Sequence, residues 1–232
     1  MKTIGLIGGM SWESSIEYYR LVNELVRERL GGMHSADCVM YSVDFAEIEP
    51  LQSQGKWDEA ARVMIEVARR MEAAGADFLV LCTNTMHKVA DDVERRIGIP
   101  LLHIADAAAE EVRARGLRSV GLLGTRFTME QDFYRDRLAD RHGLRVLVPN
   151  AEDRAEVDRV IYQELVVGRI REASRARYRE VMQRLVADGA RGIVLGCTEI
   201  GHLVGDEDAS VPLLDTTRIH ARAAVGYALG DE

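Results

Sequence analysis

Two stretches of the sequence end an apolar run in residues that could do chemistry. Residues 79–88 read LVLCTNTMHK, and residues 193–202 read IVLGCTEIGH. Aligned on the GAD and GAR that precede them, the two stretches place Thr83 opposite Cys197. A cysteine at a helix N-terminus has a lowered pKa, so its thiolate is available as a base or nucleophile. The sequence therefore predicts a reactive thiol at Cys197 and a hydroxyl at the equivalent position of the other copy.

The residues beside these two positions predict a site for a small carboxylate. Hydroxyl and amide residues of this kind cap helix N-termini, where backbone N–H groups bind anions. The turns GGMS (8–11) and GTRF (124–127) offer further N–H groups for the same purpose. Three more side chains could assist a proton transfer: Glu199 and His202 beside the thiol, and His87 on the other face.

These turns must be positioned by strands, and the whole chain alternates short β-rich apolar runs with amphipathic helical patterns. That alternation is typical of an α/β fold with parallel sheets. The expected strands are 3–8, 37–44, 77–82, 100–104, 119–124, 145–149, 192–197 and 212–215. The expected helices include 13–30, 56–74, 85–97, 105–115, 129–142 and 173–188.

The chain also contains an internal repeat. TIGLIGGM matches SVGLLGTR, GADFLVLCTNT matches GARGIVLGCTE, and IPLLHIAD matches VPLLDTTR, in that order along the sequence. The repeat predicts two similar α/β lobes related by a pseudo-twofold axis. Ligands bind beyond the carboxyl ends of parallel strands, so we expect the active site in a cleft between the lobes.

Composition narrows the classes of function. The 232 residues are 47% hydrophobic and 29% charged, with a net charge of -8, so neither nucleic acid nor an anionic membrane is expected as a partner. No apolar run reaches 18 residues, and the N-terminus resembles a first strand rather than a signal peptide. Three cysteines cannot all pair, and their spacing is not that of a zinc site, so we expect a cytoplasmic protein without a metal.

Three other classes of protein fit the sequence less well. GLIGGM has glycines at 5, 8 and 9, which is not the G-x-G-x-x-G of nicotinamide enzymes. A pyridoxal-phosphate racemase needs a Schiff-base lysine, and the only lysines are Lys2, Lys56 and Lys88, without a phosphate-binding context. A two-lobed periplasmic-type binding protein is disfavoured by the missing signal sequence and by Cys197.

The motifs GGMSWESS, CTNTMHK, LLGTRFTMEQDFY and GCTEIG resemble those of the aspartate/glutamate racemase family of cofactor-independent amino-acid racemases. The resemblance covers essentially the whole chain and is closest to the bacterial branch that acts on aspartate and glutamate. It implies two α/β lobes with swapped C-terminal segments, so that the first lobe is formed by 1–99 plus 215–232 and the second by 100–214. It also implies an active site between the lobes, no cofactor and an acidic amino acid as substrate. We also expect a homodimer.

The resemblance also implies roles for individual residues. The family's usual pair of cysteines, which remove and return the α-proton from opposite faces, falls on Thr83 and Cys197. The positions that hold the substrate's α-carboxylate and amino groups are Asn84, Thr85, Thr125 and Thr198. The residues near the other end of the substrate are Met10 and Gln52. Independently of the resemblance, a side-chain carboxylate needs polar or basic partners, and the candidates for that contact are Gln52, Lys88 and Arg126.

Thr83 departs from the commonest family pattern. A threonine hydroxyl titrates roughly 7 pKa units above a free thiol, so as a base it costs on the order of 10 kcal/mol more. We therefore expect Cys197 to be the proton-transfer thiol, with Thr83 serving the opposite face as a weak acid or a water-orienting group. Because the enantiomers have equal free energy, Thr83 can slow both directions but cannot make racemisation one-way.

A site with a single cysteine leaves a second function open. Related α/β proteins with one cysteine in the second half decarboxylate or isomerise small dicarboxylates, protonating a planar intermediate on one face. The choice between aspartate and glutamate, and the preferred enantiomer, are not readable from the sequence.

Overall fold

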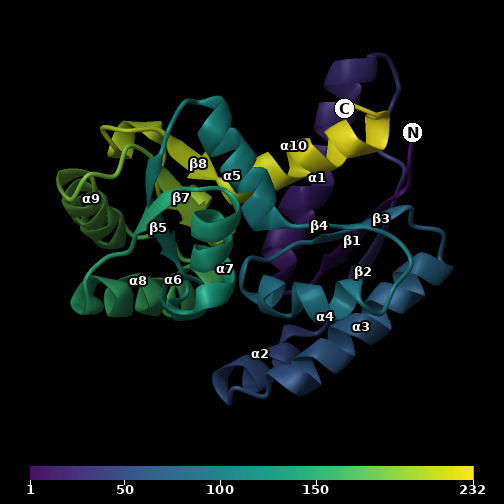
Figure 1. Cartoon of the computed structure of the whole chain (residues 1–232), viewed down its shortest axis with the longest axis horizontal. Coiled ribbons are helices and arrows are strands. Elements are labelled where there is room, and N and C mark those ends of the chain that lie inside the picture. The colour runs from purple at the N-terminus through teal and green to yellow at the C-terminus, as the bar shows by residue number, and fades with distance from the viewer. Residues whose placement is uncertain (232) are drawn as a thin grey trace. The chain divides into compact units, whose positions relative to one another are not determined.

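A computed structural model describes residues 1–231, which form two compact units (Figure 1). Unit 1 contains Met1–Ile104 and the segment that begins at His220, and unit 2 contains Ala105–Ile219. Each unit is built on a four-stranded parallel sheet covered by helices. The prediction of two similar α/β lobes is therefore confirmed.

The two sheets have the same strand order. In unit 1 the order is β2-β1-β3-β4, and the strands are β1 (Ile4–Gly8), β2 (Cys38–Ser42), β3 (Phe78–Leu81) and β4 (Leu101–Leu102). In unit 2 the order is β6-β5-β7-β8, and the strands are β5 (Ser119–Gly124), β6 (Arg145–Leu147), β7 (Ile193–Gly196) and β8 (Leu213–Asp215). All eight predicted strands form within their expected ranges, and the matching order confirms the repeat.

Four long helices lie close to their expected ranges: α1 (Trp12–Leu30), α3 (Trp57–Ala73), α5 (Ile104–Ala114) and α9 (Glu172–Ala187). The helix expected at 85–97 is a 3₁₀ turn, Thr85–Val89, followed by α4 (Ala90–Glu94). The helix expected at 129–142 is divided into α6 (Arg126–Glu130), α7 (Asp132–Asp136) and a π-helical turn, Arg137–Arg141. Further 3₁₀ turns are Leu165–Val167, Ile200–His202 and Asp206–Asp208.

Three helices were not predicted from the sequence: α2 (Phe45–Ser53), α8 (Ala151–Gln163) and α10 (Thr216–Leu229). Pro50 lies inside α2, where it removes a helical hydrogen bond and disguises the pattern. In α8 the buried apolar positions form a narrow stripe on a helix that is otherwise rich in charge. These helices are stabilised by packing on the sheets more than by their own sequence pattern.

Alternating side chains divide the core of unit 1 between the two faces of its sheet. Leu79 and Leu81 pack on one face with α2, α3 and α4, while Phe78, Val80 and Cys82 pack on the other with α1 and α10 (Figure 1). The C-terminal helix therefore completes a core whose strands come from the first half of the chain.

Unit 2 packs α8 and α9 on one face of its sheet, with Tyr178 fully buried between them. Arginines of this layer neutralise three buried carboxylates. Arg184 bonds Asp153 with Nε 2.8 Å from Oδ2, while Arg159 lies 3.0 Å from a Glu164 oxygen. The third carboxylate, Asp208, is paired with Arg179. Among residues 1–231, no helix is long and apolar enough to cross a membrane.

A histidine with no exposed surface lies where the chain re-enters unit 1. His220 Nε2–H donates to the Leu102 carbonyl, 2.9 Å away, and the Tyr18 hydroxyl donates to Nδ1, also 2.9 Å away. Both ring nitrogens are used in the neutral form. Burial lowers the pKa of His220 from its ordinary 6.5 to about 4.

We predict that His220 makes folding sensitive to mild acid. Below pH 6.5 His220 binds a proton in the unfolded chain, whereas in the folded chain it stays neutral until about pH 4. The free energy of unfolding therefore falls as the pH is lowered from 6.5 to 4. The full loss corresponds to about 3 kcal/mol. Urea unfolding at pH 7 and pH 4.5 measures this loss, and the difference in unfolding free energy between the two pH values should be smaller in His220→Gln. An equal pH dependence in both proteins would contradict the prediction.

Candidate functional site

The Thr83 turn begins where β3 ends. Leu81 pairs with Ile7 of β1, and Thr83 N–H donates 2.8 Å to the Leu81 carbonyl, which turns the chain out of the sheet. Thr83, Asn84 and Thr85 follow in sequence and are all buried. A short polar segment is therefore enclosed at the carboxyl edge of the sheet, where ligands of parallel sheets bind.

The first turn of the chain lies beside it, because β1 and β3 are hydrogen-bonded neighbours. Gly9 has φ +93, and a Cβ there would lie 2.1 Å from the Val43 carbonyl oxygen, so only glycine fits. Met10 follows and is buried. The structure thus brings Met10 and the Thr83 turn to one edge of unit 1.

The Cys197 turn occupies the equivalent place in unit 2. Gly196 ends β7, and a Cβ there would lie 3.0 Å from the Leu123 carbonyl oxygen. The Cys197 thiol donates to Glu199 Oε2 at 3.0 Å, and the Thr198 hydroxyl donates to the same oxygen at 2.7 Å. Cys197 is 8% exposed and Glu199 4% exposed, so a carboxylate and a thiol are in contact with little water.

This contact reverses one expectation from the sequence. Burial, and then the neighbouring Glu199 charge, raise the pKa of the Cys197 thiol well above its usual value, whereas a lowered pKa was expected. Only a single 3₁₀ turn, Ile200–His202, follows the cysteine. No long helix therefore begins there whose dipole could stabilise the thiolate. Cys197 is therefore a protonated thiol at rest, hydrogen-bonded to the group that can accept its proton.

The other predicted residues of unit 2 lie at the neighbouring strand end. Gly124 of β5 pairs with Gly196, which places the Thr125 turn beside the Cys197 turn. Thr125 caps α6 by accepting the Thr128 N–H at 3.4 Å. Arg126 N–H donates to Asp158 of α8 at 2.8 Å. Asp158 was not predicted, because the charged pattern of α8 gave no signal that this carboxylate would accept a hydrogen bond from the Thr125 turn.

The predicted assisting residues and distal contacts lie in varied surroundings. His87 is buried in the 3₁₀ turn after Thr83, whereas His202 is exposed. Gln52 is buried in α2, Lys88 lies 4.7 Å from the ring centre of Trp57, and Arg126 stacks over Phe127. Cys82 is fully buried in the core, and Cys38 is half-buried in β2. Among residues 1–231, no cluster of three or more acidic, histidine or cysteine side chains could hold a metal.

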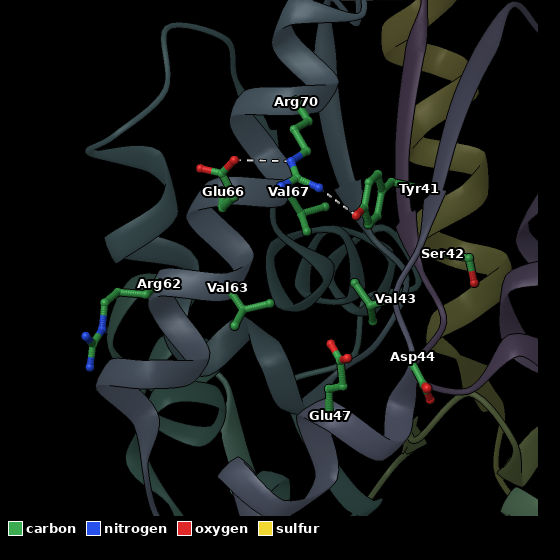
Figure 2. A pocket seen from close by; sticks show the side chains of 10 residues that line it. All are labelled: Tyr41, Ser42, Val43, Asp44, Glu47, Arg62, Val63, Glu66, Val67 and Arg70. Atoms are coloured by element: carbon green, nitrogen blue, oxygen red, sulfur yellow. Dashed lines mark hydrogen bonds and ion pairs between the residues drawn. The ribbon is translucent and has the colours of Figure 1, made fainter.

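Figure 2 shows a separate open pocket in unit 1, between the end of β2 and α3. It has a volume of about 440 Å³ and an apolar wall formed by Val43, Val63 and Val67. Arg70 crosses it, bonded to Glu66 at 3.1 Å and to the Tyr41 hydroxyl at 3.0 Å. None of the predicted site residues lines this pocket, so it is distinct from the Thr83 turn.

Comparison with known proteins assigns a family to this arrangement. A family model described as Asp/Glu/hydantoin racemase matches residues 7–224. A crystal structure from Yersinia pestis, of a protein assigned to the Asp/Glu racemases, is 56% identical, with a TM-score of 0.93 over 99% of this chain and 100% of that one. An aspartate racemase homologue from Pyrococcus horikoshii is 36% identical, with a TM-score of 0.85 and the same coverage.

A curated relative extends the comparison. The broad-specificity amino-acid racemase RacX of Bacillus subtilis is 21% identical over 97% of this chain and 98% of its own length. These matches span both units, so the likeness extends to both strand-end turns.

The thiol–carboxylate contact predicts how Cys197 titrates. Glu199→Gln removes a negative charge 3.0 Å from the sulfur, so the thiolate should form at a lower pH than in the unchanged protein. Thiolate absorbance near 240 nm measures this, with the matched Cys197→Ser variant subtracted to remove the other two cysteines. A thiolate that forms at an unchanged or higher pH would show that Glu199 does not control the thiol.

Proposed function

The chain belongs to the Asp/Glu/hydantoin racemase family, and from this membership we propose that it interconverts L- and D-forms of aspartate and glutamate without a cofactor. The observation that carries the proposal is the buried Cys197–Glu199 pair at the end of β7, with Thr83 at the equivalent end of β3. The Yersinia pestis and Pyrococcus horikoshii proteins support an acidic substrate. The Bacillus subtilis relative makes other amino acids worth testing as substrates.

Cys197 removes the α-proton from one enantiomer in this mechanism. Glu199 first accepts the thiol proton along their 3.0 Å contact, and the thiolate then takes the proton from the α-carbon. The electron pair of that C–H bond stays on the substrate as a planar carbanion. The raised pKa of the thiol makes the thiolate a stronger base once it has formed, which suits a weakly acidic C–H group.

Thr83 serves the opposite face of the carbanion. An alkoxide at Thr83 would cost on the order of 10 kcal/mol more than a thiolate. If the Thr83 hydroxyl acts as the weak acid, a water molecule therefore replaces its proton in the same step; otherwise the hydroxyl orients a water molecule that gives the proton directly. The proton held on Glu199 then returns to the solvent, so no charge is left in the site. Equal free energies of the enantiomers require equal kcat/KM in the two directions. The threonine therefore limits the rate of inversion in both directions without favouring a product at equilibrium.

The polar residues of the two turns hold the substrate. We assign Asn84, Thr85, Thr125 and Thr198 to its α-carboxylate and amino groups, and Met10 and Gln52 to its other end. Because the Thr198 hydroxyl gives its proton to Glu199, its oxygen offers lone pairs to the substrate ammonium. This arrangement couples binding of the amino group to the carboxylate that receives the thiol proton.

We also propose that the protein is a cytoplasmic homodimer. All three cysteines are free thiols in the structure, which suits a reducing compartment. Trp12, Ile16 and Tyr19 form an exposed apolar stripe along one face of α1. Sedimentation equilibrium of the protein and of Ile16→Glu measures the association; a monomeric unchanged protein would refute it.

The direct test is proton NMR of the protein with L-aspartate or L-glutamate in D2O, with chiral analysis of the same samples. We expect loss of the α-proton together with the D-enantiomer. Exchange with the L-configuration kept would mean that only the Cys197 face works. No exchange would refute racemisation, and release of CO2 from a malonate-type substrate would then establish the decarboxylase alternative.

Substitution at the two equivalent positions should have opposite effects. Cys197→Ala should abolish turnover, because the thiol that follows β3, Cys82, is buried in the core against α1 and α10. Retained turnover would refute the assignment. Thr83→Cys should raise turnover by restoring a second group of suitable pKa. Chiral chromatography of timed reactions measures both, and a fall in Thr83→Cys would mean that the hydroxyl itself is required.

A further inference from the structure

His87 is buried four residues after Thr83, and its two ring nitrogens have different backbone partners. Nδ1 lies 2.7 Å from the Thr83 carbonyl oxygen, and Nε2 lies 3.2 Å from the Ile104 backbone nitrogen. A carbonyl oxygen can only accept and a backbone N–H can only donate. The ring must therefore carry its proton on Nδ1 and present a lone pair at Nε2, so in this arrangement the imidazole is neutral.

The Ile104 N–H that His87 accepts belongs to the first residue of α5. The first N–H groups of a helix have no partner within the helix, and the positive end of its dipole disfavours a cation there. The Nε2 lone pair satisfies one of these groups. The same ring therefore joins the turn that carries Thr83 to the last residue of unit 1, Ile104, from which the chain continues into unit 2.

Two other buried histidines enclose this ring. The His103 ring centre lies 4.5 Å from that of His87, and the His220 ring centre lies 5.7 Å away. His220 is itself held by the Leu102 carbonyl and the Tyr18 hydroxyl. Because these groups leave little room for the ring to turn, the two hydrogen bonds of His87 are held in place by packing as well as by their own geometry.

We propose that His87 is a positioning residue for the reaction: it holds the Thr83–Thr85 turn against the start of α5 and does not itself transfer the substrate's proton. This inference rests on the proposed racemase function. It replaces the earlier hypothesis that His87 assists as an acid or base, because both of its nitrogens are occupied by backbone groups. Its contribution passes through the Thr83 carbonyl and the residues beside it.

The test compares two replacements of the ring. His87→Leu removes both hydrogen bonds, whereas His87→Gln keeps one donor and one acceptor but cannot carry a proton at neutral pH. We expect His87→Leu to lower kcat/KM about tenfold or more, through displacement of the turn. The ratio of inverted product to α-deuterated substrate of retained configuration should fall with it. His87→Gln should recover kcat/KM to within a few-fold, and His34→Leu, at an exposed histidine, is the matched control.

The outcomes separate a positioning role from the alternatives. A folded His87→Leu protein with unchanged kinetics would overturn the proposal. A folded His87→Gln protein that is as inactive as His87→Leu would also overturn it, because that result indicates that His87 carries a proton. If His87→Leu does not fold, the kinetics of His87→Gln alone decide. A variant that only melts earlier, with its product ratio unchanged, would indicate a purely structural residue and would also overturn it.

A measurement without turnover keeps this inference separate from the racemase proposal. Long-range ¹⁵N–¹H spectra of the unchanged protein at pH 7 report the ring tautomer, for which we expect a proton on Nδ1 alone. A proton on Nε2 would overturn the positioning role even in an active enzyme. If the expected tautomer is found but the protein racemises no amino acid, the racemase proposal fails. The positioning role then depends on the amide chemical shifts of Thr83–Thr85. It stands if His87→Gln changes these shifts less than His87→Leu does, and equal changes would overturn it.

Discussion

The parallel pairing of the central strands in each unit decides where the candidate residues lie. β1 pairs with β3, and β5 pairs with β7, so the carboxyl ends of each pair share one sheet edge. Polar turns follow these ends and are enclosed there by neighbouring backbone. The close approach is possible because glycines stand at the crowded points: Gly9 faces the Val43 carbonyl, and Gly196 faces Leu123. A side chain at Gly9 would push apart segments that the site requires to be adjacent, and one at Gly196 would make a tight contact with its neighbours.

Within this framework the two turns differ in electrostatics. The Cys197 turn contains a thiol and a carboxylate in direct contact, with Thr198 bonded to the same carboxylate oxygen. The Thr83 turn places a hydroxyl at the equivalent position, and the buried imidazole of His87, four residues further on, is occupied by backbone hydrogen bonds. An internally repeated fold can therefore hold two chemically unequal turns, because the repeat constrains backbone positions while leaving the reacting side chains free to differ.

Buried neutral histidines join the Thr83 turn to the points where the chain leaves and re-enters unit 1. His87 contacts Ile104, and His220 contacts Leu102. Each ring uses one nitrogen as donor and one as acceptor, which requires the neutral form. The low pKa of His220 also reflects the neutral form, because burial disfavours the charged imidazolium. Order in the turn and resistance to mild acid therefore depend on one group of side chains.

Much of the fold was predictable because its signals are local. Eight short apolar runs bounded by turn residues became eight strands, and the internal repeat implied two similar lobes and the equivalence of Thr83 and Cys197. Helices α2 and α8 escaped prediction because Pro50 and a high density of charge obscured their apolar stripes. They form where a sheet face offers them a surface on which to pack.

The sequence by itself determined the reactive residue types and the strand ends at which they occur, since both depend on neighbours along the chain. Only the tertiary structure decided their charge states and partners. The thiol pKa of Cys197 is raised by burial and by Glu199, and the tautomer of His87 follows from backbone groups of Thr83 and Ile104. Desolvation and hydrogen bonding depend on distances of a few ångströms between segments, and the order of residues along a chain does not specify those distances.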